Sequence, residues 1–168
     1  MQLKPIRLDS STKNASILKF LRIGFYLLLV WNLGIIAAPY LVASHVKMAQ
    51  YFGSLIYFFM DPVCHQLPER SLFLADLPMP VCARCFFIYS AGLFITGFAY
   101  LTKRFRFWPW YVYALMALFS GMEIIAEKIH LYDNWIELRA FSGIVLGILI
   151  FRLILEGIIN GNRKDKHR

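Results

Sequence analysis

Four long apolar runs constrain this chain more than any other feature, because runs of this length are unusual in a small soluble domain. They cover residues 23–43, 86–101, 108–126 and 140–159. As a helix, the first run spans roughly 31 Å at about 1.5 Å per residue, which matches the ~30 Å hydrocarbon core of a bilayer. Only 17% of the residues are charged, whereas a typical soluble domain has about a quarter. The pattern predicts an all-α integral membrane protein with four transmembrane helices.

The basic residues predict the orientation of these helices. The net charge is +8, but the Lys and Arg residues stand in short blocks beside the apolar runs rather than in one patch. This arrangement is typical of topology signals and argues against nucleic-acid binding. With four spans, the basic segments 1–22 and 160–168 and the cluster at 103–106 fall on one side. The positive-inside rule then predicts a multi-pass protein of the lipid bilayer with both termini in the cytoplasm.

The transmembrane domain, residues 23–159, then has a long outer loop at residues 44–85. Within it, the apolar stretch 48–60 is too short to cross a bilayer. We therefore expect a short interfacial or re-entrant helix there.

The outer loop contains all the cysteines of the chain, Cys64, Cys82 and Cys85. A Cys-x-x-Cys turn places two thiolates on one side of a bend, and a second Cys or His pair about 15 to 20 residues away completes many zinc sites. Cys64 and His65 stand at about that separation from Cys82. The spacing predicts a metal site made of Cys64, His65, Cys82 and Cys85, with zinc as the cofactor.

Two details of this site leave alternatives open. Adjacent Cys-His ligands are unusual, so His130 or His45 is an alternative to His65 as the nitrogen ligand. Met60 and Met79 lie near the cysteines in the sequence, and such soft ligands leave Cu(I) as an alternative to zinc.

Other functions are also compatible with the cysteines. Thiols outside the cytoplasm tend to oxidise, so Cys82 and Cys85 could form a redox disulfide that Cys64 attacks. The protein would then be a quinone-linked membrane thiol oxidoreductase. A third interpretation is an accessory subunit of a larger membrane complex, because the chain is small and offers no convincing substrate pocket.

Charged residues gather near the same outer boundary. Glu123, Glu127 and His130 share one helical face, and Glu123 should face the bundle interior because an ionised group in the hydrocarbon is costly. We interpret three arginines in two ways: as partners of these acids, or as a clamp for a phosphate or carboxylate group. They are Arg70, Arg84 and Arg139. The six residues together are candidates for the surroundings of the metal or for an anion or proton site.

Two further patterns concern packing. Arg152 and Glu156 stand one helical turn apart and should form an ion pair. Gly143 and Gly147 form a small-xxx-small pattern, which predicts a close contact between two transmembrane helices.

These residues resemble a family of uncharacterised bacterial integral membrane proteins, the domain of unknown function DUF2085. The resemblance rests on a signature of three short motifs, which matches Cys64-His65-Gln66, Arg70-Ser71 and Cys82-Ala83-Arg84-Cys85. It extends to the acid at Glu123 and to a motif matched by Leu138-Arg139 and Ser142-Gly143. One departure is Phe86-Phe87, where family members have a small pair of residues. The resemblance implies the bacterial cytoplasmic membrane and a helical fold, and it implies no reaction.

Overall fold

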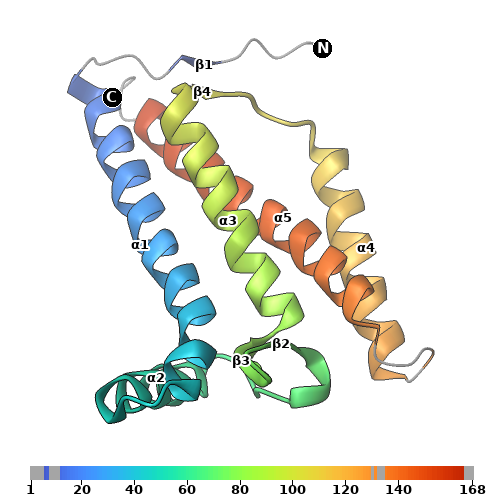
Figure 1. Cartoon of the computed structure of the whole chain (residues 1–168). Helices are drawn as coiled ribbons and strands as arrows, with labels where there is room; N and C mark the ends of the chain where they lie inside the picture. The colour runs from blue at the N-terminus through green and yellow to red at the C-terminus, as the bar shows by residue number, and fades with distance from the viewer. Residues whose placement is uncertain (1–5, 8–11, 130, 132–134, 165–168) are drawn as a thin grey trace.

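The computed structural model describes residues 6–7, 12–129, 131 and 135–164, and most of these residues are helical (Figure 1). The helices of this described part are α1 (Thr12–Ala43), α2 (Lys47–Met60), α3 (Ala83–Thr102), α4 (Trp110–Lys128) and α5 (Ile136–Lys164). A short 3-10 helix, η1 (Pro68–Arg70), precedes a hairpin of β2 (Ser71–Leu74) and β3 (Leu77–Cys82). A second antiparallel pair joins β1 (Ile6–Arg7) to β4 (Arg104–Phe105).

Among the described helices, three are long and apolar enough to cross a membrane. These candidate spans are Ala15–Ala43 in α1, Ala83–Thr102 in α3 and Ile136–Gly161 in α5. They correspond to three of the four predicted spans, with helical ends that extend beyond the apolar runs. Helix α4 corresponds to the remaining predicted span, residues 108–126, but is not among the candidates. Glu123, Glu127 and Lys128 lower the apolar character of its last two turns. The chain is thus a mostly helical protein with three candidate membrane-crossing helices.

Helices α3 and α5 form the most extensive contact between helices and run in the same direction. Glycines permit this approach. A Cβ atom on Gly143 would lie 2.5 Å from the carbonyl oxygen of Arg84, and one on Gly147 would lie 2.7 Å from that of Ile88. The predicted close helix contact at Gly143 and Gly147 is therefore confirmed, and its partner is α3.

Two apolar clusters hold the bundle together at its opposite ends. The first joins the start of α1 to the ends of α3 and α5, through Ile17, Leu21, Ala99, Phe105, Leu155 and Ile159. The second lies where α1 ends and the outer loop folds back on it, and consists of Ile35, Met60, Cys64, Met79 and Val81. One of the cysteines thus belongs to a core of the fold.

The predicted short helix in the outer loop is confirmed as α2, which lies across the end of α1 (Figure 1). The close approach needs Gly53, because a Cβ there would lie 2.9 Å from the backbone nitrogen of Val42. The hairpin that follows is a new element. Its two-residue turn places Ala75 and Asp76 at positive φ, 51° and 59°, as a type I′ hairpin turn requires.

The predicted pair of Arg152 and Glu156 is also confirmed, at 3.8 Å. The Arg152 guanidinium additionally lies over the rings of Phe105 and Trp108, at 4.6 and 4.0 Å from their centroids. This cation–π contact ties α5 to the segment between α3 and α4.

Candidate metal centre and its arginine-rich cleft

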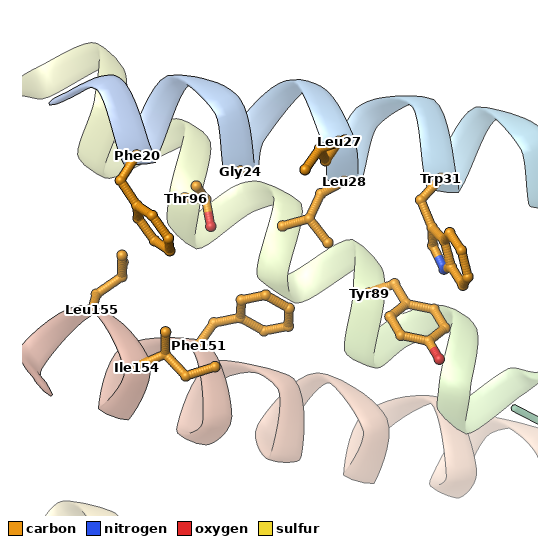
Figure 2. A pocket seen from close by; sticks show the side chains of 10 residues that line it. All are labelled: Phe20, Gly24, Leu27, Leu28, Trp31, Tyr89, Thr96, Phe151, Ile154 and Leu155. Carbon is orange, nitrogen blue, oxygen red and sulfur yellow. The ribbon is translucent and has the colours of Figure 1, made fainter. Parts of the chain in front are cut away.

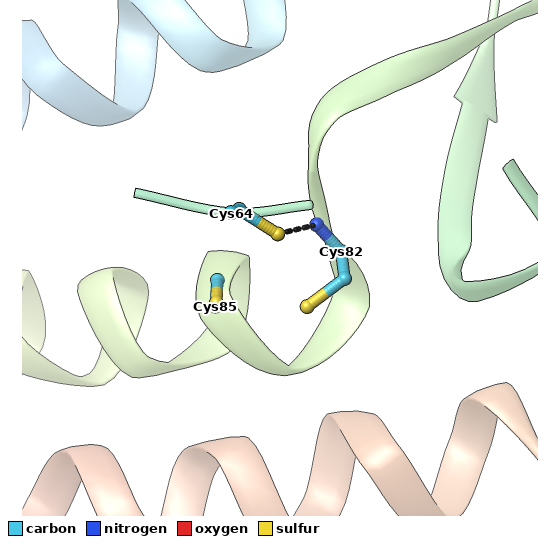
Figure 3. A group of neighbouring side chains, drawn as sticks. All are labelled: Cys64, Cys82 and Cys85. Atoms are coloured by element: carbon cyan, nitrogen blue, oxygen red, sulfur yellow. Dashed lines mark hydrogen bonds between the residues drawn. The ribbon is translucent and has the colours of Figure 1, made fainter. Parts of the chain in front are cut away.

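Three different elements bring the cysteines together. Cys64 follows α2, where its backbone N–H donates to the carbonyl oxygen of Met60 at 2.9 Å. Cys82 ends β3 and caps α3, and Cys85 lies in the first turn of that helix. The three sulfur atoms lie within 4.8 Å of one another (Figure 3). All three cysteines are free thiols.

Hydrogen bonds organise the three sulfurs around Cys64. The thiols of Cys82 and Cys85 donate to its sulfur, and these bonds hold the pKa of the Cys64 thiol below its ordinary value. The backbone N–H of Cys82 also donates to this sulfur, at 3.1 Å. The side-chain hydrogen bond to Cys64 raises the pKa of the Cys82 thiol. Hydrogen bonding within the cluster therefore makes the Cys64 thiol easier to deprotonate than the Cys82 thiol.

This geometry could hold a metal ion. Sulfur ligands lie about 2.3 Å from zinc, so three sulfurs that are already mutually close need only small shifts to share one ion. Met60 and Met79 are buried in the apolar cluster that contains Cys64. Both methionines therefore belong to the apolar core that contains Cys64, and Cu(I) stays an alternative prediction.

The histidines lie differently from the cysteines. His65 is exposed and is not part of the group of converging ligand atoms found among the described residues. It does line the cleft onto which the cysteines open. His45 is exposed in the turn between α1 and α2, and the prediction for His130 lies outside the described residues.

The predicted acids and arginines form one network beside the cysteines. A single Nη2 atom of Arg84 donates to both carboxylate oxygens of Glu123 at 2.8 Å and also to Glu127. Arg139 donates to Glu127 from the other side, and Arg70 lies 3.5 Å from the same carboxylate. Glu123 and Arg139 are buried, at 6% and 3% exposure. The predicted inward orientation of Glu123 is thus confirmed, and its partner is the arginine between the two cysteines of the Cys-x-x-Cys motif.

Three polar residues of the quoted motifs have structural tasks that residue chemistry alone did not suggest. Gln66 adopts a positive φ of 49° and donates from its side-chain amide to the Tyr57 carbonyl at 2.6 Å, which fixes the loop after Cys64. Ser71 is fully buried and donates to the Leu67 carbonyl at 3.0 Å. Ser142 accepts a 3.3 Å hydrogen bond from Nε of Arg84. Only the motif signature pointed to these positions.

The cysteines open onto a cleft of about 270 Å³. It is lined by the three cysteines, by three arginines and by four residues of the loop around Cys64: Cys64, Cys82, Cys85, Arg70, Arg84, Arg139, Val63, His65, Gln66 and Leu67. The carboxylates of Glu123 and Glu127 are not among the described residues that line it. The cleft is therefore walled by sulfur and by positive charge.

A separate apolar groove of about 380 Å³ lies between α1, α3 and α5 (Figure 2). Trp31 and Tyr89 stand at one end of it, with their ring centroids 5.7 Å apart in an edge-to-face contact. Both rings pack against the cluster that contains Cys64. The indole N–H of Trp31 is buried and has no acceptor among the described residues.

Comparison with known proteins places the chain in a family. The profile of a family described as "Predicted membrane protein (DUF2085)" matches residues 64–153, which include all three cysteines and the whole charged network. The chain belongs to this family. The uncharacterized protein MJ1492 of Methanocaldococcus jannaschii is 30% identical to the chain over 133 residues, covering 76% of this chain and 85% of the relative. No solved structure matches the chain.

Family membership confirms the resemblance drawn from the motifs, and it agrees with a membrane location. MJ1492 is an archaeal protein, so relatives of this DUF2085 chain are not confined to bacteria. The bacterial cytoplasmic membrane therefore stays a prediction.

Proposed function

We propose that the chain is a metal-binding membrane protein in which Cys64, Cys82 and Cys85 hold one zinc ion through three thiolates. The observation that supports this is the convergence of the three sulfurs from three separate elements. Buried free cysteines that merely fill a core have no reason to converge in this way. The three sulfurs occupy three positions of a tetrahedral site, and the fourth position is on the side of the cleft.

An open fourth position favours a site that binds a ligand over a purely structural one. Structural zinc is normally enclosed by four protein ligands, whereas catalytic zinc keeps a position for water or substrate. His65 lies at the rim of the cleft and remains the candidate for closing the site. An accessory role in a membrane complex stays a further proposal, because the exposed apolar side chains of α1 and α4 can contact either lipid or other subunits.

We place the metal centre outside the cytoplasm, in a fold with four membrane crossings. The support is the parallel arrangement of α3 and α5. If α3 and α5 cross the membrane in the same direction, the chain must cross back between them. Helix α4 lies between them in the sequence and runs in the opposite direction to α5 (Figure 1). With α4 as the fourth crossing, the basic segments at both termini and at 103–106 share one side, which is the cytoplasmic side by the positive-inside rule.

Elemental analysis of the purified full chain tests the metal proposal. We expect about one zinc per chain and its loss on Cys64→Ser, Cys82→Ser or Cys85→Ser, each of which removes a thiolate ligand. Stoichiometric copper in place of zinc would identify the Cu(I) site that Met60 and Met79 favour. A chain that retains its fold yet contains no stoichiometric metal would refute the proposal.

The second candidate function is the quinone-linked thiol oxidoreductase, and the apolar groove favours it. A quinone tail would fit the apolar walls, and the unpaired indole N–H of Trp31 would meet a quinone carbonyl near the cysteines. The thiols of Cys82 and Cys85 would lose two electrons and two protons to the quinone, which forms a disulfide and a quinol. Thiol counting on the isolated protein separates the two functions, since a Cys82–Cys85 disulfide excludes ligation by both thiolates.

A further inference from the structure

Among the described residues, the cleft beside the cysteines has more positive than negative charge. Three guanidinium groups meet two carboxylates, those of Glu123 and Glu127, which leaves one positive charge in excess within this network. Neither acid is among the described residues that line the cleft, and Glu127 lines a neighbouring hollow together with Arg70 and Arg84. A ligand in the cleft would therefore contact the arginines rather than the acids.

The hydrogen-bond inventory shows the same excess. Three guanidinium groups offer about fifteen N–H donors, whereas two carboxylates accept about eight hydrogen bonds at most. Arg139 is buried, with 3% of its surface exposed, and its Nε–H has no acceptor among the described residues. A buried donor without an acceptor is costly. Among the described residues, the ion pair of Arg70 is a 3.5 Å contact to Glu127, and its side chain is 41% exposed, so its guanidinium group is accessible to a ligand.

We propose that this cleft binds a phosphate group, as free phosphate or as the headgroup of a lipid, between Arg70 and Arg139 and beside the metal. A tetrahedral oxyanion presents several oxygens at once, so it suits converging guanidinium groups better than a planar carboxylate does. The cysteine wall of the same cleft places the bound phosphate next to the metal, and this part of the proposal rests on the proposed function. Arg84 is a positioning residue, because Glu123, Glu127 and Ser142 already hold its side chain.

The two halves of the cleft would carry opposite charges. Zinc with three thiolates would carry one negative charge, whereas the arginine–glutamate network of the described residues carries one positive charge. The positive charge is therefore concentrated at the arginines, and a bound phosphate would contact that half of the cleft.

Binding of phosphate to the full chain tests this inference in two arms. In the first, the protein in neutral detergent is titrated with inorganic phosphate, with sodium chloride at matched ionic strength as the reference. In the second, the protein in the same neutral detergent is mixed with phosphatidylglycerol or with diacylglycerol, which lacks the phosphate, and retained lipid is measured by native mass spectrometry. Saturable binding in the first arm identifies free phosphate, and selective retention in the second identifies a lipid headgroup.

Arg70→Gln provides the decisive variant, because the exposed Arg70 can be replaced without emptying the buried network. We expect it to weaken phosphate or headgroup binding about tenfold, the effect of losing one charge-assisted contact. Lys128→Gln is the matched control. Lys128 lines the neighbouring hollow with Arg70, Arg84 and Glu127 but is not among the residues that line the cleft itself. Its replacement removes one positive charge nearby without removing a cleft residue, and should change affinity less than about twofold.

The outcomes separate this inference from the proposed metal site. Absence of binding in both arms, or equal weakening by both variants, would overturn the phosphate site. Metal content is measured on the same samples. Phosphate binding without metal would refute the proposed metal site but not the phosphate site. Metal without phosphate binding would refute the phosphate site but not the metal site.

Discussion

The carbonyl oxygen of Arg84 lies directly against Gly143, at a separation that leaves no room for a side chain on the glycine. The backbone of the Cys-x-x-Cys motif thus touches α5 at the level where Arg84 enters the charged network. Packing between α3 and α5 and the geometry of the candidate site therefore depend on the same contact.

Replacing Gly143 should disturb both. A Cβ at that position would lie 2.5 Å from the Arg84 carbonyl, so Gly143→Ala must push the helices apart, at a cost of about 1–3 kcal/mol typical of overpacking. We expect a lower midpoint of thermal unfolding in detergent and a weaker hold on the metal. Gly157→Ala is the control on the same helix, because a Cβ there meets nothing within 4 Å. Equal effects of the two substitutions would argue against the contact.

Glu123→Gln tests the buried ion pair. The substitution keeps the shape of the side chain but removes the charge that faces Arg84 at 2.8 Å. Hydrogen bonds to charged groups contribute about 1.5–3 kcal/mol, so we expect destabilisation of that order, measured by thermal unfolding. Glu137→Gln changes an exposed acid at the start of α5 and should leave the unfolding midpoint unchanged. An unchanged unfolding midpoint for Glu123→Gln would mean that, of the two acids, Glu127 alone stabilises the position of Arg84.

His65→Ala distinguishes an open metal site from a closed one. Because His65 is exposed and outside the group of converging sulfurs, we expect the variant to retain about one metal per chain, measured by elemental analysis beside His45→Ala. Complete loss of metal from His65→Ala alone would show that the loop after Cys64 closes around the ion. The fourth ligand predicted from the sequence would then be correct.

Reporter fusions test the fourth membrane crossing. A topology reporter inserted at Asp76 in the hairpin turn should be active outside the cytoplasm. Reporters at Lys103 and after the last residue should both be active inside, because α4 and α5 together return the chain to its starting side. A C-terminal reporter on the same side as Asp76 would show that α4 does not cross.

Much of the fold follows from sequence because apolar length is a strong and local signal. It located both ends of α3 and α5 to within about five residues and the end of α1 at Ala43, whereas α1 begins at Thr12, well before the predicted run. The cost of burying charge placed Glu123 inside the bundle. The hairpin was missed for equally local reasons. Its turn, Ala75-Asp76, has no glycine or asparagine to mark positive φ, and β3 contains Pro78 and Pro80, which usually argue against a strand.

The residues of the candidate site could be predicted from the sequence, but the contacts between them could not. Spacing identified the cysteines, but only the folded hairpin brings Cys64 to Cys82, which stand 18 positions apart in the chain. The pairing of Arg84 with Glu123 spans 39 positions and joins two helices that pack separately on α5. Such contacts depend on tertiary packing, on which neither periodicity nor motif spacing carries information.

The placement of Arg84 between Cys82 and Cys85 has a mechanical consequence. Within one turn of α3, sulfur ligands project toward the cluster while the guanidinium reaches Glu123 and Glu127 on α4. Any rotation of that turn that tightens or loosens the sulfur cluster must also pull on α4, whose other contacts are mainly with α5. A metal bound by the three cysteines would therefore be coupled to the position of α4, and a change in either one would shift the energy of the other.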